Sequence, residues 1–407
     1  MVTKYDLLYS VYSNEGLAAN ELVKKLGKKQ EKFPVFYKHL RELEDEKYLT
    51  LKDKKYFLKK EKKTIDLLHL IDFCVRNKID YNQLFLPKTI EFIKEGLENN
   101  EITGKTIDNK TRARIVTLLE KQGFIIVDSK RPFKARIVYS DFLEKLTKYF
   151  VKEIKINGKR LHEYIDEKKL DSNIEKEFSK YKKQTKTFSI DEEINFIHRS
   201  LSLEGNTLTL PETEQLIKRN IPPKGRTFKE MQETTDYKKA VEQLINDKNP
   251  LTLKRVLEFH KVAMNSMEKS AGEIRQQKVQ IKGNPNFKTA NWKEIPSLLK
   301  EIFYKYSKEI EEKIKAKEAI ELATKLHADF QWTHPFVDGN SRTSRAIFQH
   351  TLMLAGFPLI QFSAGFTKQY MEQTKLSQKR NDTTFTLLMK QICLHSLKQT
   401  NKKIKYS

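Results

Sequence analysis

The segment His-Pro-Phe-Val-Asp-Gly-Asn-Ser-Arg-Thr-Ser-Arg, residues 334–345, decides how the second half of the chain is interpreted. An amphipathic helix is predicted to begin directly after the Gly339-Asn340 turn. The free backbone N–H groups and the positive dipole end of that helix then point into the loop and form an anion site. Arg342 and Arg345 fall on one face of its first turn, where cations oppose the dipole unless they meet a bound polyanion.

Two further side chains in this segment suit nucleotide chemistry. Asp338 is a hard oxygen ligand of the kind that holds Mg²⁺ against phosphates. His334 is a base whose ordinary pKa lies near physiological pH. Taken singly, a histidine before proline commonly only ends a helix, and Asp-Gly-Asn is a common turn. The combination predicts a reaction on a nucleotide phosphate.

The segment resembles the signature of the Fic family, His-Pro-Phe-x-Asp/Glu-Gly-Asn-Gly/Lys-Arg-x-x-Arg. The resemblance continues through residues 326–330 before it and 354–358 after it, and it covers about half the chain, residues 190–400. The chain departs from the pattern at Ser341, where members that transfer AMP usually carry glycine. The serine either crowds a phosphate that glycine would admit, or caps the helix, or donates a hydroxyl hydrogen bond.

The resemblance implies a protein adenylyltransferase, an enzyme that transfers AMP from ATP to a Ser, Thr or Tyr hydroxyl of a target protein or of itself. It implies that His334 takes the hydroxyl proton and that Asp338 holds Mg²⁺. The amides of Gly339, Asn340 and Ser341 would cradle the α- and β-phosphates. Arg342 and Arg345 would neutralise the outer phosphates, including the γ-phosphate.

A second segment resembles the family's target-docking flap. Gly272-Glu273-Ile274-Arg275 precedes a strand-like stretch formed by Lys278, Val279, Gln280 and Ile281. The resemblance implies a small β-hairpin at this place.

A third segment, Ser200-Leu-Ser-Leu-Glu204-Gly205, matches the family's inhibitory helix, expected over residues 194–205. Ser200 and Glu204 lie four apart on one face, and Gly205 is a natural residue just past a helix end. A carboxylate in the last helical turn is unfavourable next to the dipole unless it meets a cation. A solvated glutamate would be the plain interpretation, but the resemblance implies that Glu204 pairs with Arg345 in the space that the γ-phosphate needs.

Composition limits the class of protein. The 407 residues are 38% hydrophobic and 32% charged, and the two cysteines, Cys74 and Cys393, lie far apart without neighbouring metal ligands. We therefore predict a cytoplasmic protein without a disulfide framework, zinc finger or membrane partner. The formal charge of +24 is spread over both halves, so charge alone does not establish nucleic-acid binding.

The first 140 residues predict two winged-helix-like modules, residues 1–60 and 61–140. In the first, helices are expected at 5–12, 18–26 and 33–47 and a hairpin at 48–51 and 56–58. In the second, helices are expected at 65–75, 87–97 and 109–122 and strands at 124–127 and 135–139. The third helices offer Lys38 and Arg41 in the first module and Lys110, Arg112 and Arg114 in the second. Duplex DNA binding and docking of a protein are both open.

The fold class expected is mainly α: a helical Fic core with a small β-hairpin flap, preceded by the tandem winged-helix-like modules. Residues 141–189 are expected to form a helical connector, and long helices are expected at 237–246, 252–267, 295–308, 315–330 and 342–355. Two alternatives stay open: a hydrolase that removes AMP with the same site, and a DNA-binding regulator with a degenerate Fic core. A homodimer is also among the states that the sequence allows.

Overall fold

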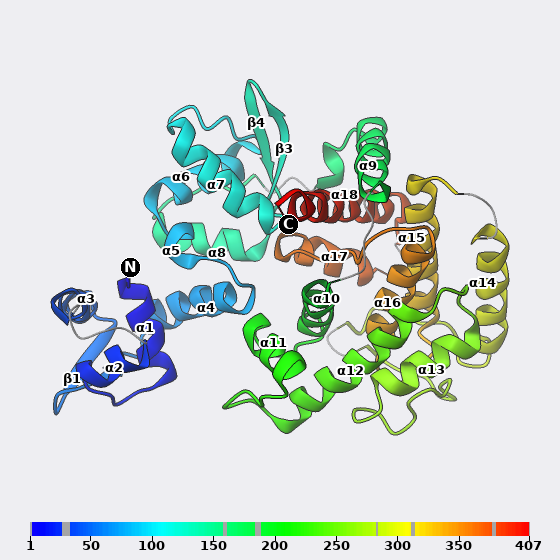
Figure 1. Ribbon diagram of the computed structural model, residues 1–407, viewed down its shortest axis with the longest axis horizontal. Coiled ribbons are helices and arrows are strands. Elements are labelled where there is room, and N and C mark those ends of the chain that lie inside the picture. The colour runs from blue at the N-terminus through cyan, green and yellow to red at the C-terminus, as the bar shows by residue number, and fades with distance from the viewer. Residues whose placement is uncertain are drawn as a thin grey trace. The chain divides into compact units, whose positions relative to one another are not determined.

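The computed structural model describes residues 2–26, 33–157, 161–183, 189–281, 284–310, 314–376 and 380–406 (Figure 1). It divides into two compact units. The N-terminal unit comprises Met1–Leu118, Val127–Ile137 and Asp141–Asn157, and the C-terminal unit comprises Leu119–Ile126, Val138–Ser140 and Gly158–Ser407. Among the described residues, no helix combines the length and apolar character needed to cross a membrane.

The N-terminal unit begins with three helices and a hairpin, as the sequence predicts. They are α1 (Lys4–Ser13), α2 (Ala19–Lys25), α3 (Phe33–Asp45), β1 (Leu49–Lys52) and β2 (Lys55–Leu58). Thr3 and Asp6 form a capping box that starts α1. The hairpin pairs Leu49 with Leu58, and an isolated bridge from Leu17 to Tyr56 adds a third, very short edge.

The same order follows up to residue 150, with additional helices, although the end of α7 and the start of β3 belong to the C-terminal unit. The elements are α4 (Lys62–Arg76), α5 (Tyr81–Leu84), α6 (Pro87–Asn99), α7 (Asn109–Lys121), β3 (Ile125–Lys130), β4 (Phe133–Ile137) and α8 (Asp141–Phe150). A bridge from Ile102 to Ala135 joins the hairpin to the preceding loop. Helix α8 packs on α4 and α6, so the start of the expected connector lies within the N-terminal unit.

The C-terminal unit is helical, and the mainly α fold class is confirmed. Its elements are η2 (Leu161–Glu163), α9 (Glu167–Lys182), α10 (Ile190–Ser202), α11 (Leu210–Arg219), α12 (Phe228–Asn246), α13 (Leu253–Ala263), α14 (Ile295–Ile310), α15 (Ala316–Thr333), α16 (Asn340–Leu354), η3 (Ala364–Phe366), α17 (Thr367–Thr374) and α18 (Asp382–Tyr406). The expected helix at 237–246 is the second half of α12.

Helices α15 and α16 lie between two hydrophobic clusters of this unit. One cluster joins them to α9 and α18, and the other joins them to α10, α12, α13 and α14. Because both helices are held on two sides, the loop that connects them, residues 334–339, has fixed ends. That loop carries His334 and Asp338.

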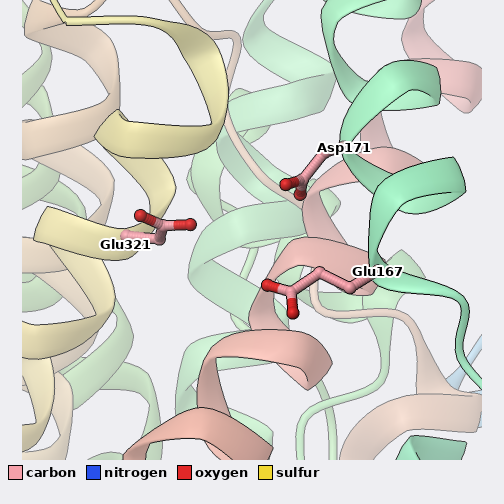
Figure 2. A group of neighbouring side chains, drawn as sticks. All are labelled: Glu167, Asp171 and Glu321. Atoms are coloured by element: carbon pink, nitrogen blue, oxygen red, sulfur yellow. The ribbon is translucent and has the colours of Figure 1, made fainter.

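A buried lysine links α9, α15 and α18. Glu167, Asp171 and Glu321 face one another (Figure 2), and Lys390 Nζ lies 3.0, 2.9 and 2.6 Å from their carboxylates. The Lys390 side chain is fully buried. Burial lowers the pKa of Lys390, but the three carboxylates outweigh burial and raise it. The acidic group therefore already holds a cation and is a structural ion-pair cluster.

The strand expected at Lys278–Ile281 is not formed. These residues lie in the described part of the chain, have no regular secondary structure and follow an irregular path after Gly272. A strand needs a partner strand to pair with, and the resemblance of this segment to a flap does not identify one in the chain.

Candidate active site

The loop between α15 and α16 has a defined backbone. His334 ends α15 in the left-handed conformation with φ 50°, and Pro335 prevents the helix from continuing. The Asn340 side chain accepts from the Phe336 N–H at 3.0 Å and donates to the Phe336 carbonyl at 2.9 Å. Both hydrogen bonds close the turn just before α16. The asparagine thus holds the loop with its side chain, in addition to the backbone role predicted for it.

The His334 ring is oriented as a base. Its Nδ1 lies 3.3 Å from the Gln331 carbonyl, which can only accept, so Nδ1 carries the proton and Nε2 is the basic nitrogen. Burial lowers the pKa of His334 to about 4, and the nearby Arg275 acts in the same direction. The imidazole is therefore neutral at physiological pH, as a proton acceptor must be.

The N-terminus of α16 faces the acidic end of the loop. Gly339 is the N-cap residue with φ 80°, and its N–H donates to Asp338 Oδ1 at 2.6 Å. The Asp338 side chain is 59% exposed, so its carboxylate is open to a ligand. Ser341 Oγ accepts from Gln331 Nε2 at 3.2 Å. The serine that replaces the usual glycine of the signature is thus hydrogen-bonded to α15.

Arg345 is buried and paired with the end of α10. Its Nη2 donates to Glu204 Oε1 at 2.7 Å and to the Ser200 carbonyl at 2.9 Å, and its Nε donates to Ser200 Oγ at 2.9 Å. Burial lowers the pKa of Arg345, but Glu204 outweighs it and the pKa is raised. Helix α10 ends at Ser202, so Glu204 lies in the turn after the helix and not in its last turn as expected. Gly205 follows with φ 95°.

Arg342 pairs with Glu233, a residue that no local sequence motif indicates. Its Nη1 donates to Glu233 of α12, and its Nη2 lies 3.4 Å from Asp338 Oδ2. Burial raises the pKa of Glu233, although Arg342 and Asn206 act in the opposite direction. Asn206 Nδ2 donates to the other Glu233 oxygen at 2.8 Å. Glu233 thus connects Arg342 to the segment that follows Glu204.

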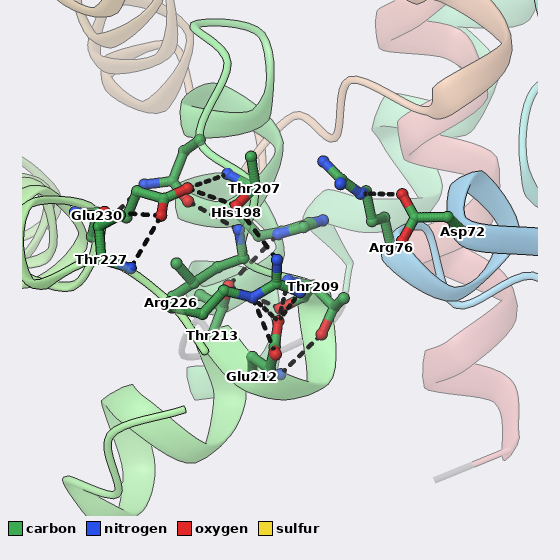
Figure 3. Close-up of polar contacts among 12 residues, drawn as sticks. Asp72, Arg76, His198, Thr207, Thr209, Glu212, Thr213, Arg226, Thr227 and Glu230 are labelled. Atoms are coloured by element: carbon green, nitrogen blue, oxygen red, sulfur yellow. Dashed lines mark hydrogen bonds and ion pairs between the residues drawn. The ribbon is translucent and has the colours of Figure 1, made fainter. Parts of the chain in front are cut away.

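The segment after Glu204 is fixed by a polar network (Figure 3). Glu230 accepts from the Thr207 N–H at 2.9 Å and from Thr227 Oγ1 at 2.8 Å. Burial would raise the pKa of Glu230, but the hydrogen bonds from Thr207 and Thr227 lower it to about 2. Arg226 binds both oxygens of Glu212, the first-turn acid of α11. These contacts hold the chain on the C-terminal side of Glu204.

The segment that resembles the flap is anchored to the loop by Arg275. Its side-chain Nε donates to the His334 carbonyl at 2.7 Å, and its backbone N–H donates to the Pro335 carbonyl at 2.8 Å. Its Nη2 donates to the Ala290 carbonyl at 2.8 Å. Arg275 is only 3% exposed. It therefore positions the backbone that carries the base.

The structure brings most of the predicted site residues together. His334 and Asp338 share the loop that leads into the first turn of α16, and Ser200 on α10 and Glu204 just after it both contact Arg345. Lys278, Val279, Gln280 and Ile281 follow Arg275 on the anchored segment, without a described contact to the loop. Arg275 belongs to the motif Gly272-Glu273-Ile274-Arg275. The sequence does not predict its hydrogen bonds to the His334 and Ala290 carbonyls.

The comparisons with known proteins agree with this geometry. Residues 250–352 match the family model described as Fic/DOC family. A protein adenylyltransferase Fic from Drosophila erecta is 27% identical over 193 residues, which are 45% of this chain and 37% of the relative. One from Aedes aegypti is 25% identical over 202 residues, 46% of this chain and 37% of the relative. The chain thus matches little more than a third of the length of these relatives.

Two solved structures show the same fold. A Fic domain containing signaling protein from Bacteroides thetaiotaomicron has a TM-score of 0.52 and 21% identity, covering 58% of this chain and 98% of that chain. Fic-1 from C. elegans has a TM-score of 0.52 and 18% identity, covering 65% and 78%. The helical core with its loop between α15 and α16 is a Fic domain. The family-model match places a Fic/DOC family domain at residues 250–352, and the comparisons together support a Fic family protein.

Proposed function

We propose that this protein is an adenylyltransferase that transfers AMP from ATP to a Ser, Thr or Tyr hydroxyl of a target protein or of itself. The observation that carries the proposal is that one short loop joins His334, whose Nδ1 lies on the Gln331 carbonyl, to the N-terminus of α16, which has no side-chain cap. The hydroxyl oxygen attacks the α-phosphorus, the bond to the β-phosphate oxygen breaks, and pyrophosphate leaves. The hydroxyl proton passes to His334 Nε2.

The phosphates would lie at the start of α16. The N–H groups of Gly339, Asn340 and Ser341 supply donors and the positive dipole end, and Arg342 and Arg345 supply positive charge. Asp338 fits Mg²⁺, because Mg²⁺ is commonly held by one exposed carboxylate together with substrate phosphates. The ion would neutralise charge on the phosphates when bound.

Glu204 would hold this activity back. Its carboxylate lies 2.7 Å from the same Arg345 that the γ-phosphate would need, and it is tethered in the same chain. The two anions therefore compete for one guanidinium. The carboxylate is favoured while α10 stays in place.

The test is self-labelling with α-labelled ATP and Mg²⁺, wild type against Glu204→Gly. We expect the variant to be labelled well above wild type. A folded Glu204→Gly protein that binds ATP without faster labelling would falsify the inhibitory role. If it instead retains AMP that wild type removes, the site is a hydrolase in which Glu204, 24% exposed, orients water.

A second proposal concerns residues 2–60, which we infer to be a winged-helix module that binds duplex DNA. The bridge between Leu17 and Tyr56 adds the third short edge of such a module to the β1–β2 hairpin. Exposed cations lie on α3 and on the hairpin: Lys38, Arg41, Lys52, Lys54 and Lys55.

In the second module one of the predicted cations, Arg112, is engaged within the unit, whereas Lys110 and Arg114 are exposed. Arg112 donates to the Gly104 carbonyl and lies over the Phe133 ring, so its guanidinium is engaged within the unit. Replacing Lys38 and Arg41 should lower the slope of log K against log salt by about 2, whereas replacing Arg112 should leave it nearly unchanged. Lack of any duplex binding at low salt would favour a protein-docking module.

A further inference from the structure

The loop that carries Asp338 and Gly339 is held from behind by a buried histidine. His260 lies in the last turn of α13 and is fully buried. Its ring stacks on Phe336 with centroids 3.5 Å apart and an interplanar angle of 11°. Both ring nitrogens are used. Nδ1 lies 2.8 Å from the Gly272 backbone nitrogen, and Nε2 lies 2.9 Å from the Asp338 backbone carbonyl oxygen.

The two partners fix the tautomer of this ring. An amide N–H can only donate, so His260 Nδ1 must carry the lone pair. A carbonyl oxygen can only accept, so Nε2 must carry the proton. His260 is therefore a donor aimed at one particular oxygen of the loop.

This hydrogen bond determines which way the Asp338–Gly339 peptide faces. A trans peptide is planar, and its C=O and N–H point to opposite sides. With the carbonyl held on His260, the Gly339 N–H is directed to the other side, where it meets Asp338 Oδ1 at 2.6 Å. Arg342 lies on that side as well, 3.4 Å from the same carboxylate. A reversed peptide would present a carbonyl oxygen there.

Glycine at 339 is required for this approach. A Cβ on Gly339 would lie 2.9 Å from His260 Nε2 and 2.7 Å from Met264 Sδ. The positive φ of Gly339 also suits glycine. The close contact between the histidine and the loop is thus built into the sequence of both elements.

We propose that His260 is a positioning residue that prevents the Asp338–Gly339 peptide from reversing, and so keeps the Gly339 N–H, and not a carbonyl oxygen, on the side where the nucleotide phosphates would lie. This inference rests on the proposed function for the identity of the anion. His260 does not touch the substrate. Loss of the His260 side chain should therefore raise the half-saturating ATP concentration more than it lowers the maximal rate of self-labelling.

The experiment compares His260→Asn with His260→Gln in the full-length Glu204→Gly chain. The Gln amide ends near the place of Nε2 and can donate to the Asp338 carbonyl, whereas the Asn amide ends near the place of Nδ1 and cannot reach it. Both lose the ring on Phe336. The readout is the half-saturating ATP concentration for self-labelling and the maximal rate.

We expect His260→Asn to raise the half-saturating concentration about 10-fold and His260→Gln to restore most of that loss. His350→Asn is the matched control, because His350 is also fully buried and its Nε2 lies 3.0 Å from a backbone carbonyl, that of Asp247. Equal values for the Asn and Gln variants, or the same loss in the control, would overturn the proposal.

Two measurements cover the remaining cases. If His260→Asn does not fold, His260→Phe keeps the ring stack without either hydrogen bond, and a native half-saturating concentration in that variant contradicts the proposal. If Glu204→Gly with native His260 is not labelled at all, the proposed function has failed instead. In that case, crystal structures of the His260 variants without nucleotide test whether the Asp338–Gly339 peptide reverses. We expect the peptide to reverse, at least in part, in the Asn variant and to stay in place in the Gln variant, and an unchanged peptide in the Asn variant overturns the proposal.

Discussion

Arg342 and Arg345 lie one turn apart on α16, and each meets a glutamate from another helix or its end, yet the two pairs differ in surroundings. Glu233 lies within α12, and its side chain is 9% exposed. Glu204 lies in the turn after α10, and its side chain is 24% exposed. Besides its ion pair with Glu204, Arg345 donates hydrogen bonds to Ser200 Oγ and to the Ser200 carbonyl.

The difference separates a fixed partner from a replaceable one. Glu233 also binds Asn206 and has little access to water, so a phosphate could displace it only by opening the core. Glu204 already reaches solvent, so an incoming anion or water can take its place at Arg345. We therefore expect the first pair to govern stability and the second to govern access of ATP.

The largest effect that tests this comparison is on stability. Glu233→Ala leaves a buried guanidinium without its carboxylate and should lower the free energy of unfolding by about 3 to 5 kcal/mol. Glu204→Ala should lower it by about 1 kcal/mol, because removal of the partly exposed Glu204 side chain would let water reach the buried Arg345, and Ser200 still accepts from it. Urea unfolding of the two variants measures both values. Equal losses would mean that the two pairs do not differ as described.

The partner of Arg342 shows what sequence could not reveal. Glu233 lies 109 positions before Arg342 and outside any local motif, and only the packing of α12 on α16 brings them together. The turn and the start of α16 were predictable, because Gly339 and Asn340 act within a few residues. Contacts between residues that are close in the sequence can be predicted from it. An ion pair between helices that are far apart in the sequence depends on how the whole core packs.

The second largest effect concerns His334, which belongs to neither pair. In the Glu204→Gly background, His334→Ala should lower the rate of AMP transfer by on the order of 10²-fold or more, because it removes the proton acceptor. ATP affinity should stay nearly native, since the imidazole acts on the acceptor hydroxyl. Labelling kinetics with calorimetric ATP binding separates the two. Near-native labelling would remove His334 from the mechanism.

A third and smaller effect tests whether Arg345 is the residue contested by Glu204 and ATP. Adding Arg345→Ala to Glu204→Gly should weaken ATP binding about 10-fold and cancel the gain in labelling. The matched control is Lys368→Ala on α17, a partly buried cation that pairs with Glu372 outside both pairs, which should leave the gain intact. If the double variant still labels as fast as Glu204→Gly, Arg345 does not bind the γ-phosphate.

The long C-terminal helix shows a second limit of sequence reasoning. Helix α18 was not predicted, although α13 and α16 were. Residues 391–397 of α18 are all buried, polar and apolar alike, so the segment has no exposed face and no helical periodicity. A helix that is buried on all sides has no alternation of apolar and polar faces in its sequence, so it cannot be predicted from that pattern. An amphipathic helix such as α13, with one face in solvent, has the pattern and can be predicted.

The smallest expected effect is the dependence of transfer on pH, and it tests whether the base is set by its surroundings. Burial lowers the pKa of His334 to about 4, so the neutral, proton-accepting form is present above that pH and lost as the pH falls through it. Between pH 6 and 8 the transfer rate at saturating ATP should therefore change by less than about 2-fold. The measurement uses the Glu204→Gly protein, so that the ion pair between Glu204 and Arg345 does not contribute to the profile. An acid limb with a midpoint near 6.5, the ordinary pKa of histidine, would show that His334 reacts from an exposed position and that the buried loop is not the reacting state.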